Sequence, residues 1–388
     1  MDQQYDYIIA GAGASGLSLA WKMLQTPLAD KKVLIVDSDL DPKNNKTWCF
    51  WDDGAPPFSN LIFHKWDRVE FSAYGNLHSQ SLTKYPYYCL RSVDFRSAIL
   101  KAVNNNPSFD LLETSISELT NTDSKAILHT GNKFFEAEYI FQSCFQPVEI
   151  QNANLRYPLL QHFLGWEISV DKPLFETSTF TLMDFDETYK RGVAFIYLLP
   201  WSKNTALIEY TIFSDELAKQ KVYEEKISLY LNNRFNLQPI DYRISRKEFG
   251  RIPMQDRPFV PWYKPRIVNM GIAGSITKPS TGYTFKRIQD HTDAIIQSLL
   301  KEGHPIFREP SNWRYKAYDL WLLQIIHDHP VEALKVFYHL FQNNTVDELF
   351  RFLGEKTNLL QDLKIMSSVP YAPFLRAIWK TKRRLREL

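Results

Sequence analysis

The sequence has few cysteines, no excess of either charge and no long apolar run. Its three cysteines, Cys49, Cys89 and Cys144, are odd in number and form no CxxC pair, which argues against a disulfide framework and against a zinc site. The 46 basic and 44 acidic residues nearly cancel, so the overall charge does not favour nucleic-acid binding. The sequence contains no run of about 18 apolar residues, so it predicts no membrane-spanning helix. The N-terminus lacks a signal-peptide pattern, so we expect a cytoplasmic protein, and we expect no bound metal.

Large aromatic residues, in contrast, are abundant. The 388 residues include 10 Trp, 20 Tyr and 26 Phe, and this length allows two or three domains around more than one core. Such a composition fits large ordinary cores and fits equally well a long apolar binding channel. Composition alone leaves both interpretations open.

The segment from Tyr5 to Asp37 carries the clearest motif. An apolar strand at 6–10 leads into a G-x-G-x-x-G turn that opens a helix, and the turn residues are Gly11, Ala12, Gly13, Ala14, Ser15 and Gly16. In such turns the glycines permit a tight bend, let the backbone approach a pyrophosphate and let helix and strand pack closely. A second strand ends on Asp37, roughly 20 residues later, the spacing expected for a carboxylate on an adenosine ribose. The segment predicts dinucleotide binding; a glycine-rich turn in an ordinary βαβ unit is the alternative.

The rest of the chain changes from mixed to β-rich and then to helical. After a strand at 139–145, which we expect to return to the nucleotide-binding sheet, three β-type runs follow at 180–185, 193–199 and 205–213. These runs predict a second, mostly antiparallel domain with one covered face.

A second glycine-rich unit lies far downstream. A strand at 265–274 ends in glycines and precedes a helix at 283–300, which predicts a second set of backbone donors for a large two-part cofactor. From His304 onward the apolar positions have helical spacing, and core packing is the default interpretation.

Six short blocks, taken in order, make the pattern more specific. They are Asn45–Trp48, Tyr88–Ser92, His162–Glu167, Leu207–Thr211, Ile252–Met254 and Lys278–Tyr283. Together with the GAGASG turn and the glycines near residue 274, these blocks resemble the lycopene cyclase family of flavoproteins. The resemblance covers residues 5–285, about three quarters of the chain.

The resemblance implies an α/β protein. We expect a Rossmann-like FAD-binding flavoprotein fold of the hydroxybenzoate-hydroxylase and glutathione-reductase type, with a β-rich substrate domain and a C-terminal helical region. The expected boundaries are 1–60, 88–150 and 250–303 for the discontinuous FAD-binding domain, 61–87 and 151–249 for the substrate domain, and 304–388 for the helical region.

The resemblance also implies which residues hold FAD. Beyond the glycine turn and Asp37, the expected contacts are Trp48, Arg91, Gly274, Ser275, Pro279, Thr281, Gly282 and Tyr283. For Trp48 a structural anchor is the alternative, and for Arg91 a plain surface arginine. Related flavin enzymes usually carry an Asp-Gly pair after the strand at 139–145 and a Gly-Asp pair after the downstream strand. This chain has neither, so the ribityl hydroxyls would lose a carboxylate partner.

The implied reaction is the acid-catalysed cyclisation of the linear ends of lycopene to β-rings, an isomerisation without net redox change. Reduced FAD, with NAD(P)H as the electron source, would stabilise the cation without being consumed. Glu209 matches the first acid of the family's motif. In the predicted strand it shares a face with Leu207, Thr211 and Phe213, and a desolvated carboxyl has a raised pKa that suits a proton donor. An exposed face, with Glu209 an ordinary surface acid, is the alternative.

The expected partners are a polyene and a membrane surface. Tyr197 and Trp201 are the expected substrate contacts, because aromatic faces stabilise cations, and packing is the alternative for each. Since lycopene lives in the bilayer, we expect peripheral membrane association, through the C-terminal region or its basic tail at 380–386. Two other functions stay open: an NAD(P)H-dependent monooxygenase or prenyl reductase, and a non-catalytic flavin- or lipid-binding protein.

Overall fold

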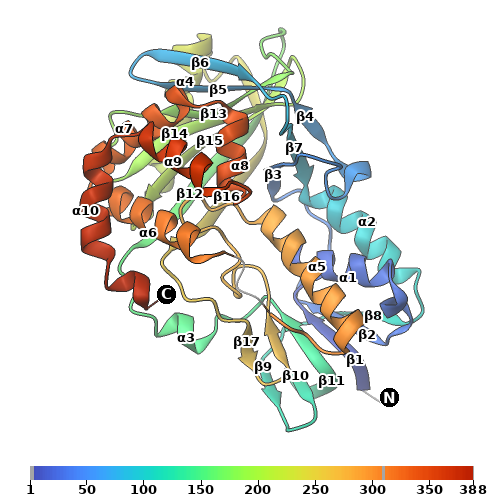
Figure 1. Cartoon of the computed structure of the whole chain (residues 1–388). Coiled ribbons are helices and arrows are strands. Elements are labelled where there is room, and N and C mark those ends of the chain that lie inside the picture. Colours follow the sequence, from blue (N-terminus) through green and yellow to red (C-terminus); the bar gives the residue numbers. More distant parts are fainter. Residues whose placement is uncertain (1–3, 308–310, 388) are drawn as a thin grey trace.

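The computed structural model describes residues 4–307 and 311–387. These residues form three sheets, and helices cover the two larger ones (Figure 1). None of the described helices combines the length and the apolar character needed to cross a bilayer.

The first large sheet carries the glycine turn. Its central strands run parallel, and α1 (Ala14–Leu24), α2 (Ser92–Asn104) and α5 (Phe285–Glu302) pack on one face through an apolar core. A meander of β9, β10 and β11 covers the other face. The strands are β1 (Gln4–Ala10), β2 (Val33–Asp37), β8 (Phe109–Glu113), β9 (Glu118–Asn121), β10 (Ala126–Thr130), β11 (Lys133–Gln142), β17 (Trp262–Lys264) and β18 (Ile267–Asn269).

The sequence of the central strands explains this arrangement. The runs at 8–10 and 33–36 are apolar at every position and buried on both faces, as parallel strands between two covering layers require. β11 does return to this sheet, next to β1. The downstream strand expected at 265–274 is shorter, because after Asn269 the backbone turns through Gly271, whose φ is +56°.

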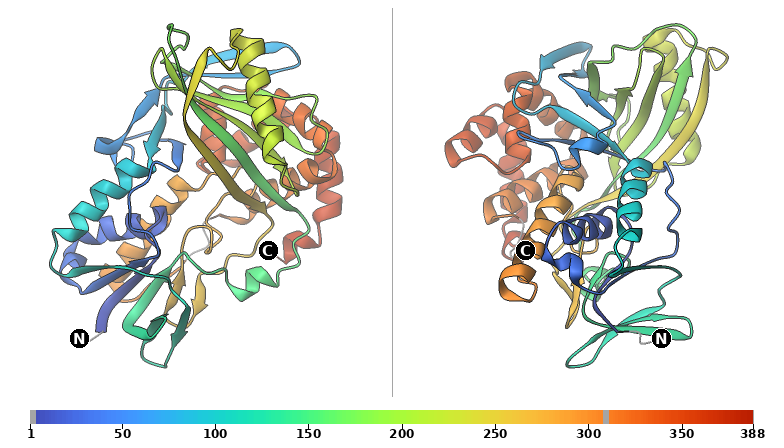
Figure 2. Two further views of the ribbon diagram at one scale, coloured as in Figure 1. Left: turned by 180° about the vertical axis from the view of Figure 1, so that it is seen from behind. Right: turned by 90° about the vertical axis from the view of Figure 1, so that its right-hand side faces the viewer.

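The second large sheet is almost wholly antiparallel. The order of its strands is β16, β12, β15, β14, β13, β5 and β6, and β13 pairs with β5 in parallel. They are β5 (Arg68–Ala73), β6 (Asn76–Ser81), β12 (Pro158–Val170), β13 (Thr179–Phe185), β14 (Val193–Pro200), β15 (Thr205–Ser214) and β16 (Tyr242–Gln255). Helix α4 (Gln220–Phe235) covers the back of this sheet (Figure 2).

Two of these strands, β12 and β16, do not stand out in the sequence. Gly165 interrupts the apolar pattern of β12, and β16 is an edge strand in which five of fourteen side chains are charged. The domain boundary expected at residue 250 therefore lies inside β16, which stays in this sheet as far as Gln255.

A small sheet and the remaining helices complete the fold. The sheet consists of β3 (Thr47–Trp51), β7 (Tyr87–Arg91) and β4 (His64–Trp66). The C-terminal helices lie over the front of the second sheet (Figure 1). They are α6 (Trp313–Asp328), α7 (Pro330–Asn343), α8 (Val346–Leu353), α9 (Leu359–Ser367) and α10 (Tyr371–Thr381). A short helix, α3 (Val148–Gln151), follows β11.

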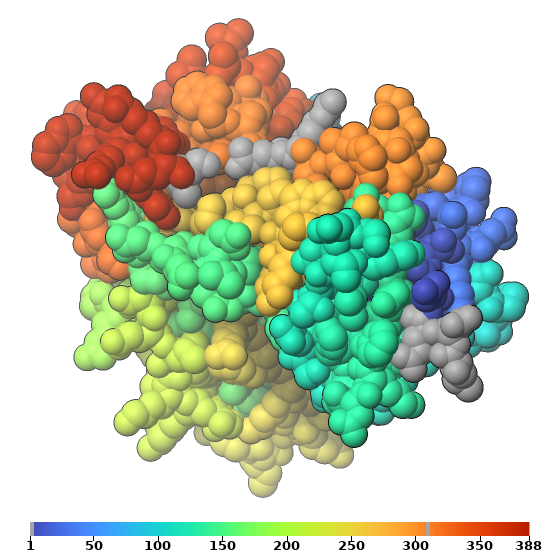
Figure 3. All heavy atoms as spheres, turned by 90° about the horizontal axis from the view of Figure 1, so that it is seen from below, coloured from blue at the N-terminus to red at the C-terminus, as the bar shows by residue number. Residues whose placement is uncertain are grey.

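The C-terminal helices are tied to the rest of the chain by buried ion pairs. Lys278, in the loop before α5, contacts Asp319 of α6 at 2.9 Å and Glu355, after α8, at 3.0 Å. Near the C-terminus the buried Arg384 donates to Asp256 at 2.6 Å. Asp256 also accepts from the backbone N–H of Tyr157, so the segments after β11 (green) and after β16 (gold) lie side by side on the underside of the molecule (Figure 3).

Candidate active site

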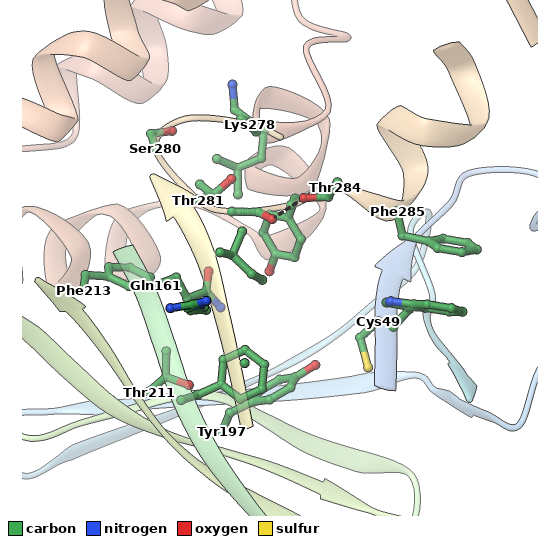
Figure 4. Close-up of a pocket in the computed structure, with 18 of the residues that line it drawn as sticks. Cys49, Gln161, Tyr197, Thr211, Phe213, Lys278, Ser280, Thr281, Thr284 and Phe285 are labelled. Carbon is green, nitrogen blue, oxygen red and sulfur yellow. Dashed lines mark hydrogen bonds between the residues drawn. The ribbon is translucent and has the colours of Figure 1, made fainter. Parts of the chain in front are cut away.

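A cavity of about 650 Å³ extends from the glycine turn of the first sheet to the C-terminal helices. The second sheet forms its floor, the loop 278–284 and β3 border its middle, and α6 to α10 enclose its far end. Figure 4 shows side chains from these elements around it, with Tyr197 and Thr211 on the sheet, Cys49 on β3 and Lys278 to Thr284 in the loop.

The glycines of the turn have distinct steric roles. A side chain at Gly16 would place Cβ 1.9 Å from the carbonyl oxygen of Gly11, so close packing requires glycine there. At Gly13, which lines the cavity, a Cβ would meet no atom within 4 Å. The space in front of Gly13, between the turn and the cavity and next to the start of α1, is therefore open.

Asp37 lies at the end of β2 and also lines the cavity. One of its carboxylate oxygens accepts a hydrogen bond from the backbone N–H of Ala12 at 2.6 Å. The other accepts from the N–H of Asp39 at 3.0 Å. Asp37 thus fixes the shape of the turn in addition to facing the cavity.

An arginine that the sequence patterns did not single out lies at this end. Arg96 of α2 lines the cavity and donates to the carbonyl oxygens of Ala12 and Asp39, both at 2.6 Å. Arg91 instead forms an ion pair with Asp94 at 2.7 Å and stacks over the ring of Phe63. The two arginines are five positions apart, but Arg91 is the last residue of β7, whereas Arg96 lies within α2 and faces the cavity.

Buried polar atoms without a partner point to a missing ligand in the middle of the cavity. Among the described residues, Gln161 Oε1 and Thr281 Oγ1 are buried and accept or donate no hydrogen bond. Both residues line the cavity. Leaving such groups unpaired is costly, so a bound polar molecule would satisfy them.

The acid Glu209 lies on the cavity side of β15 and is 7% exposed. Its neighbours on the same face, Leu207 and Phe213, belong to the apolar core between the sheet and the helices, so the exposed-face alternative does not apply. Burial raises the pKa of Glu209 well above its usual range, Glu248 and Cys49 add to the rise, and Arg246 opposes it. A raised pKa favours the protonated form of a carboxyl.

A second glutamate lies in the same row of the sheet. Gly165 of β12 pairs with Glu209 on one side and with Glu248 of β16 on the other. Directly opposed residues share a face, and a Cβ at Gly165 would approach Glu209 Cγ to 2.8 Å. The absence of a side chain at Gly165 therefore leaves room for the Glu209 carboxyl beside Glu248.

Three donors converge on the carboxylate of Glu248. They are the guanidinium of Arg246 at 2.6 Å and the N–H and hydroxyl groups of Thr47, each at 2.8 Å. These charge-assisted contacts fix Glu248 at the edge of the cavity, which it lines. The sequence patterns missed Glu248 because β16 itself was missed.

Aromatic side chains line the middle of the cavity. The hydroxyl of Tyr197 donates to that of Tyr87 at 3.0 Å, and burial raises the pKa of both phenols. Tyr283, also in the lining, is backed by Trp51, which makes a T-shaped contact with it and stacks on Phe350 outside the lining. Ring faces here offer negative quadrupole potential to any cation inside.

The far end of the cavity is apolar and comes from the C-terminal helices. The lining residues there include Trp321, Leu322, Phe337, Leu340, Phe352, Ile365, Met366 and Phe374. Apolar side chains of the helices for which core packing was predicted thus also form the wall of a cavity.

The structure brings ten of the expected site residues to the cavity and places eight elsewhere. The lining residues are Gly13, Ala14, Ser15, Asp37, Trp48, Tyr197, Glu209, Thr281, Gly282 and Tyr283. Those outside the lining are Gly11, Ala12, Gly16, Arg91, Trp201, Gly274, Ser275 and Pro279. Trp201 packs against Phe63 and Trp66 instead.

Solved structures of similar shape include flavin-dependent enzymes. One is a geranylgeranyl bacteriochlorophyll reductase-like protein from Thermoplasma acidophilum, with a TM-score of 0.60, 11% identity and coverage of 98% of this chain and 99% of the other. Another is the halogenase PltM in complex with FAD, with a TM-score of 0.61, 13% identity and coverage of 97% and 86%. At these identities the likeness concerns the fold, and it confirms the predicted flavoprotein fold.

Sequence comparison identifies the family. A lycopene beta-cyclase from Pseudescherichia vulneris is 22% identical in an alignment 388 positions long, which covers 95% of this chain and 95% of the other. The sequence model described as "Lycopene cyclase protein" matches residues 6–379, nearly the whole chain. This protein therefore belongs to the lycopene cyclase family.

Proposed function

We propose that this protein is a lycopene β-cyclase, which closes the linear ends of lycopene to β-rings by acid catalysis without net redox change. The observation that supports this most directly is Glu209, a buried acid in the wall of a cavity that is polar at one end and apolar at the other. The family assignment supports the substrate class.

In this proposal Glu209 is the proton donor. Its proton adds to the terminal double bond of the polyene and leaves a tertiary cation, which the neighbouring double bond attacks to close a six-membered ring. The ring then loses a proton, and the ionised Glu209 takes one up, so the protein returns to its starting state. The raised pKa of Glu209 supports the first step, because the donor must be protonated before the substrate binds.

The aromatic and apolar lining has two tasks. The faces of Tyr197 and Tyr283, both in the lining, stabilise positive charge in the ring-closing region. The side chains from α6 to α10 exclude water, which would otherwise trap the cation.

The residues at the polar end fit FAD. Open space in front of Gly13 suits a pyrophosphate, the free N–H groups at the start of α1 favour anions, and Gln161 and Thr281 have unused polar atoms. We propose Arg96, rather than Arg91, as the cationic side chain at this end. Bound in its reduced form, with NAD(P)H as the electron source, FAD would supply an electron-rich group that stabilises the cation.

Gly13→Val is expected to abolish flavin binding without unfolding the protein. The backbone of Gly13 is extended, with φ at −82°, and its Cβ direction is open, so the valine fits the protein alone and fills the space for the cofactor. Flavin absorbance of the purified variant measures the loss, and thermal unfolding measures the fold. Gly54→Ala, in an exposed turn, is the control. A Gly13→Val protein that still carries flavin would contradict this placement of FAD.

The overall function is tested by expression in lycopene-accumulating cells. We expect β-carotene, with unchanged mass, when the pigment is separated by chromatography. Unchanged lycopene in cells that contain folded, flavin-loaded protein would contradict the proposal. A pigment of different mass, with one NAD(P)H consumed for each product molecule, would instead identify a redox flavoenzyme.

We also propose that the protein works at a membrane surface, as a peripheral protein. A substrate as apolar as lycopene partitions into lipid, and the cavity end that suits it lies among the C-terminal helices.

A further inference from the structure

The outward face of the last two full helices is unusually apolar. Leu360 of α9 is 78% exposed and Trp379 of α10 is 82% exposed. The α9–α10 face, as we call it, consists of Leu359, Leu360, Leu363, Tyr371, Leu375, Ile378 and Trp379. An exposed apolar cluster of this size marks a binding surface, and α10 lies at the outer edge of the molecule (Figure 1).

Two exposed cations lie beside this face, at the end of α10. Residues 359–387 contain seven basic side chains and two acidic ones, Asp362 and Glu387. Most of the basic side chains are neutralised, since Lys364, Arg376 and Lys380 pair with acids of neighbouring helices and Arg383 pairs with Glu387. Asp362 is fully buried, where it pairs with Arg314 and Thr357. Lys382 and Arg386, just beyond Trp379, are exposed and form no ion pair with the described residues. At the end of α10 the rim of the face is therefore cationic, which complements the headgroups of anionic lipids.

The inner side of the same two helices lines the cavity. Ile365 and Met366 of α9, Phe374 of α10 and Val369 between them are lining residues. A single layer of helix thus separates the apolar end of the cavity from the exposed apolar face. With nine and eleven residues the two helices are too short to span a bilayer, and their pattern suits a position in the interfacial plane.

We infer that the α9–α10 face docks on an anionic lipid bilayer and that the polyene passes between α9 and α10 into the cavity. The passage of substrate rests on the proposed function, whereas the docking does not. A second copy of this chain fits the face less well, because a two-fold contact would oppose the cationic rim to itself. Tyr371 and Trp379, each with a polar atom on an apolar ring system, are the residue types that favour the lipid headgroup boundary.

The docking is tested with the full-length protein and vesicles of phosphatidylcholine, with and without phosphatidylglycerol. We expect L360Q/W379Q to lower co-sedimentation at least tenfold, since two large apolar anchors are lost. Ile240→Gln is the matched control, because Ile240 is 91% exposed and lies in the turn before β16, outside the C-terminal helices. K382Q/R386Q should weaken binding to the anionic vesicles alone.

Point variants are preferable to removal of residues 380–388, because the tail includes Arg384, whose buried ion pair with Asp256 holds the fold together. Equal sedimentation of L360Q/W379Q and the unaltered protein would overturn the docking surface. So would a concentration-dependent dimer that L360Q/W379Q dissociates in the absence of lipid, since the face would then be a contact between copies.

A third measurement separates the substrate path from the proposed function. L360Q/W379Q should convert lycopene dispersed in detergent at the normal rate and vesicle-embedded lycopene at least tenfold more slowly. Equal rates in vesicles would overturn the passage between α9 and α10. If the unaltered protein binds vesicles but forms no ring in either medium, the proposed function fails while the docking surface stands.

Discussion

Glu209→Gln is expected to stop ring formation, with a fall in rate of about 10²–10⁴-fold or more, the usual contribution of a general acid. Glutamine has nearly the same shape as the protonated acid, and burial, which raises the pKa of Glu209, favours that neutral form in the cavity wall. The fold and the flavin content should therefore not change. The measurement is β-carotene formed in a set time, together with flavin absorbance and thermal unfolding of the purified variant.

Glu167→Gln is a suitable control for this variant. Glu167 lies on β12 and, like Glu248, pairs with Arg246, but the Glu167 side chain is partly exposed and does not line the cavity. It should retain activity. Near-normal activity of Glu209→Gln would remove Glu209 from the mechanism and leave another group in the cavity as the acid.

Glu248→Gln is expected to move the alkaline limb of the pH–rate profile to lower pH. After burial, Glu248 makes the largest contribution to the raised pKa of Glu209, and Arg246 opposes it. The variant removes the negative charge of Glu248, which raises the pKa of Glu209. It keeps the positive charge of Arg246, which lowers that pKa, so the pKa of Glu209 should fall. Glu209 donates only when protonated, so activity disappears as pH rises through its pKa, and a lower pKa means an earlier loss.

The expected size follows from the pKa scale. Each unit by which the pKa of Glu209 falls lowers the rate about tenfold on the alkaline limb and leaves the rate at low pH unchanged. Initial rates over a series of pH values measure the shift. Glu167→Gln, which also removes a partner of Arg246, should shift the profile less. Two superimposable profiles for Glu248→Gln and the unaltered protein would show that the pair is not coupled.

The parts of the fold that local sequence determines were predictable. The turn at 11–16 and its two strands rely on glycine sterics and continuous apolar runs, which a few residues specify. The burial of Glu209 was predictable because side chains alternate between the two faces of β15, which puts Glu209 on the same face as Leu207 and Phe213. Its pKa partner was not predictable, because Glu248 reaches the same row only through the pairing of β15, β12 and β16.

Orientation explains the other differences. Arg91 and Arg96 lie close together in the sequence, but Arg91, at the end of β7, pairs with Asp94, whereas Arg96, on α2, reaches the glycine turn. Trp201, at the end of a strand, faces an aromatic cluster beside the cavity. The α9–α10 face was likewise hidden, since an apolar helical stripe looks the same whether it faces a core, a cavity or the outside.

The ammonium group of Lys278 has a consequence for engineering this protein. Its counter-charges come from residues 319 and 355, so a fragment that stops after α5 would lose both of them, together with the helices that enclose the far end of the cavity. The nucleotide half is then not a free-standing module, and a chimera that exchanges the C-terminal helical region between relatives must carry the matching loop with it. Grafts whose junction separates the lysine from both acids should yield insoluble protein.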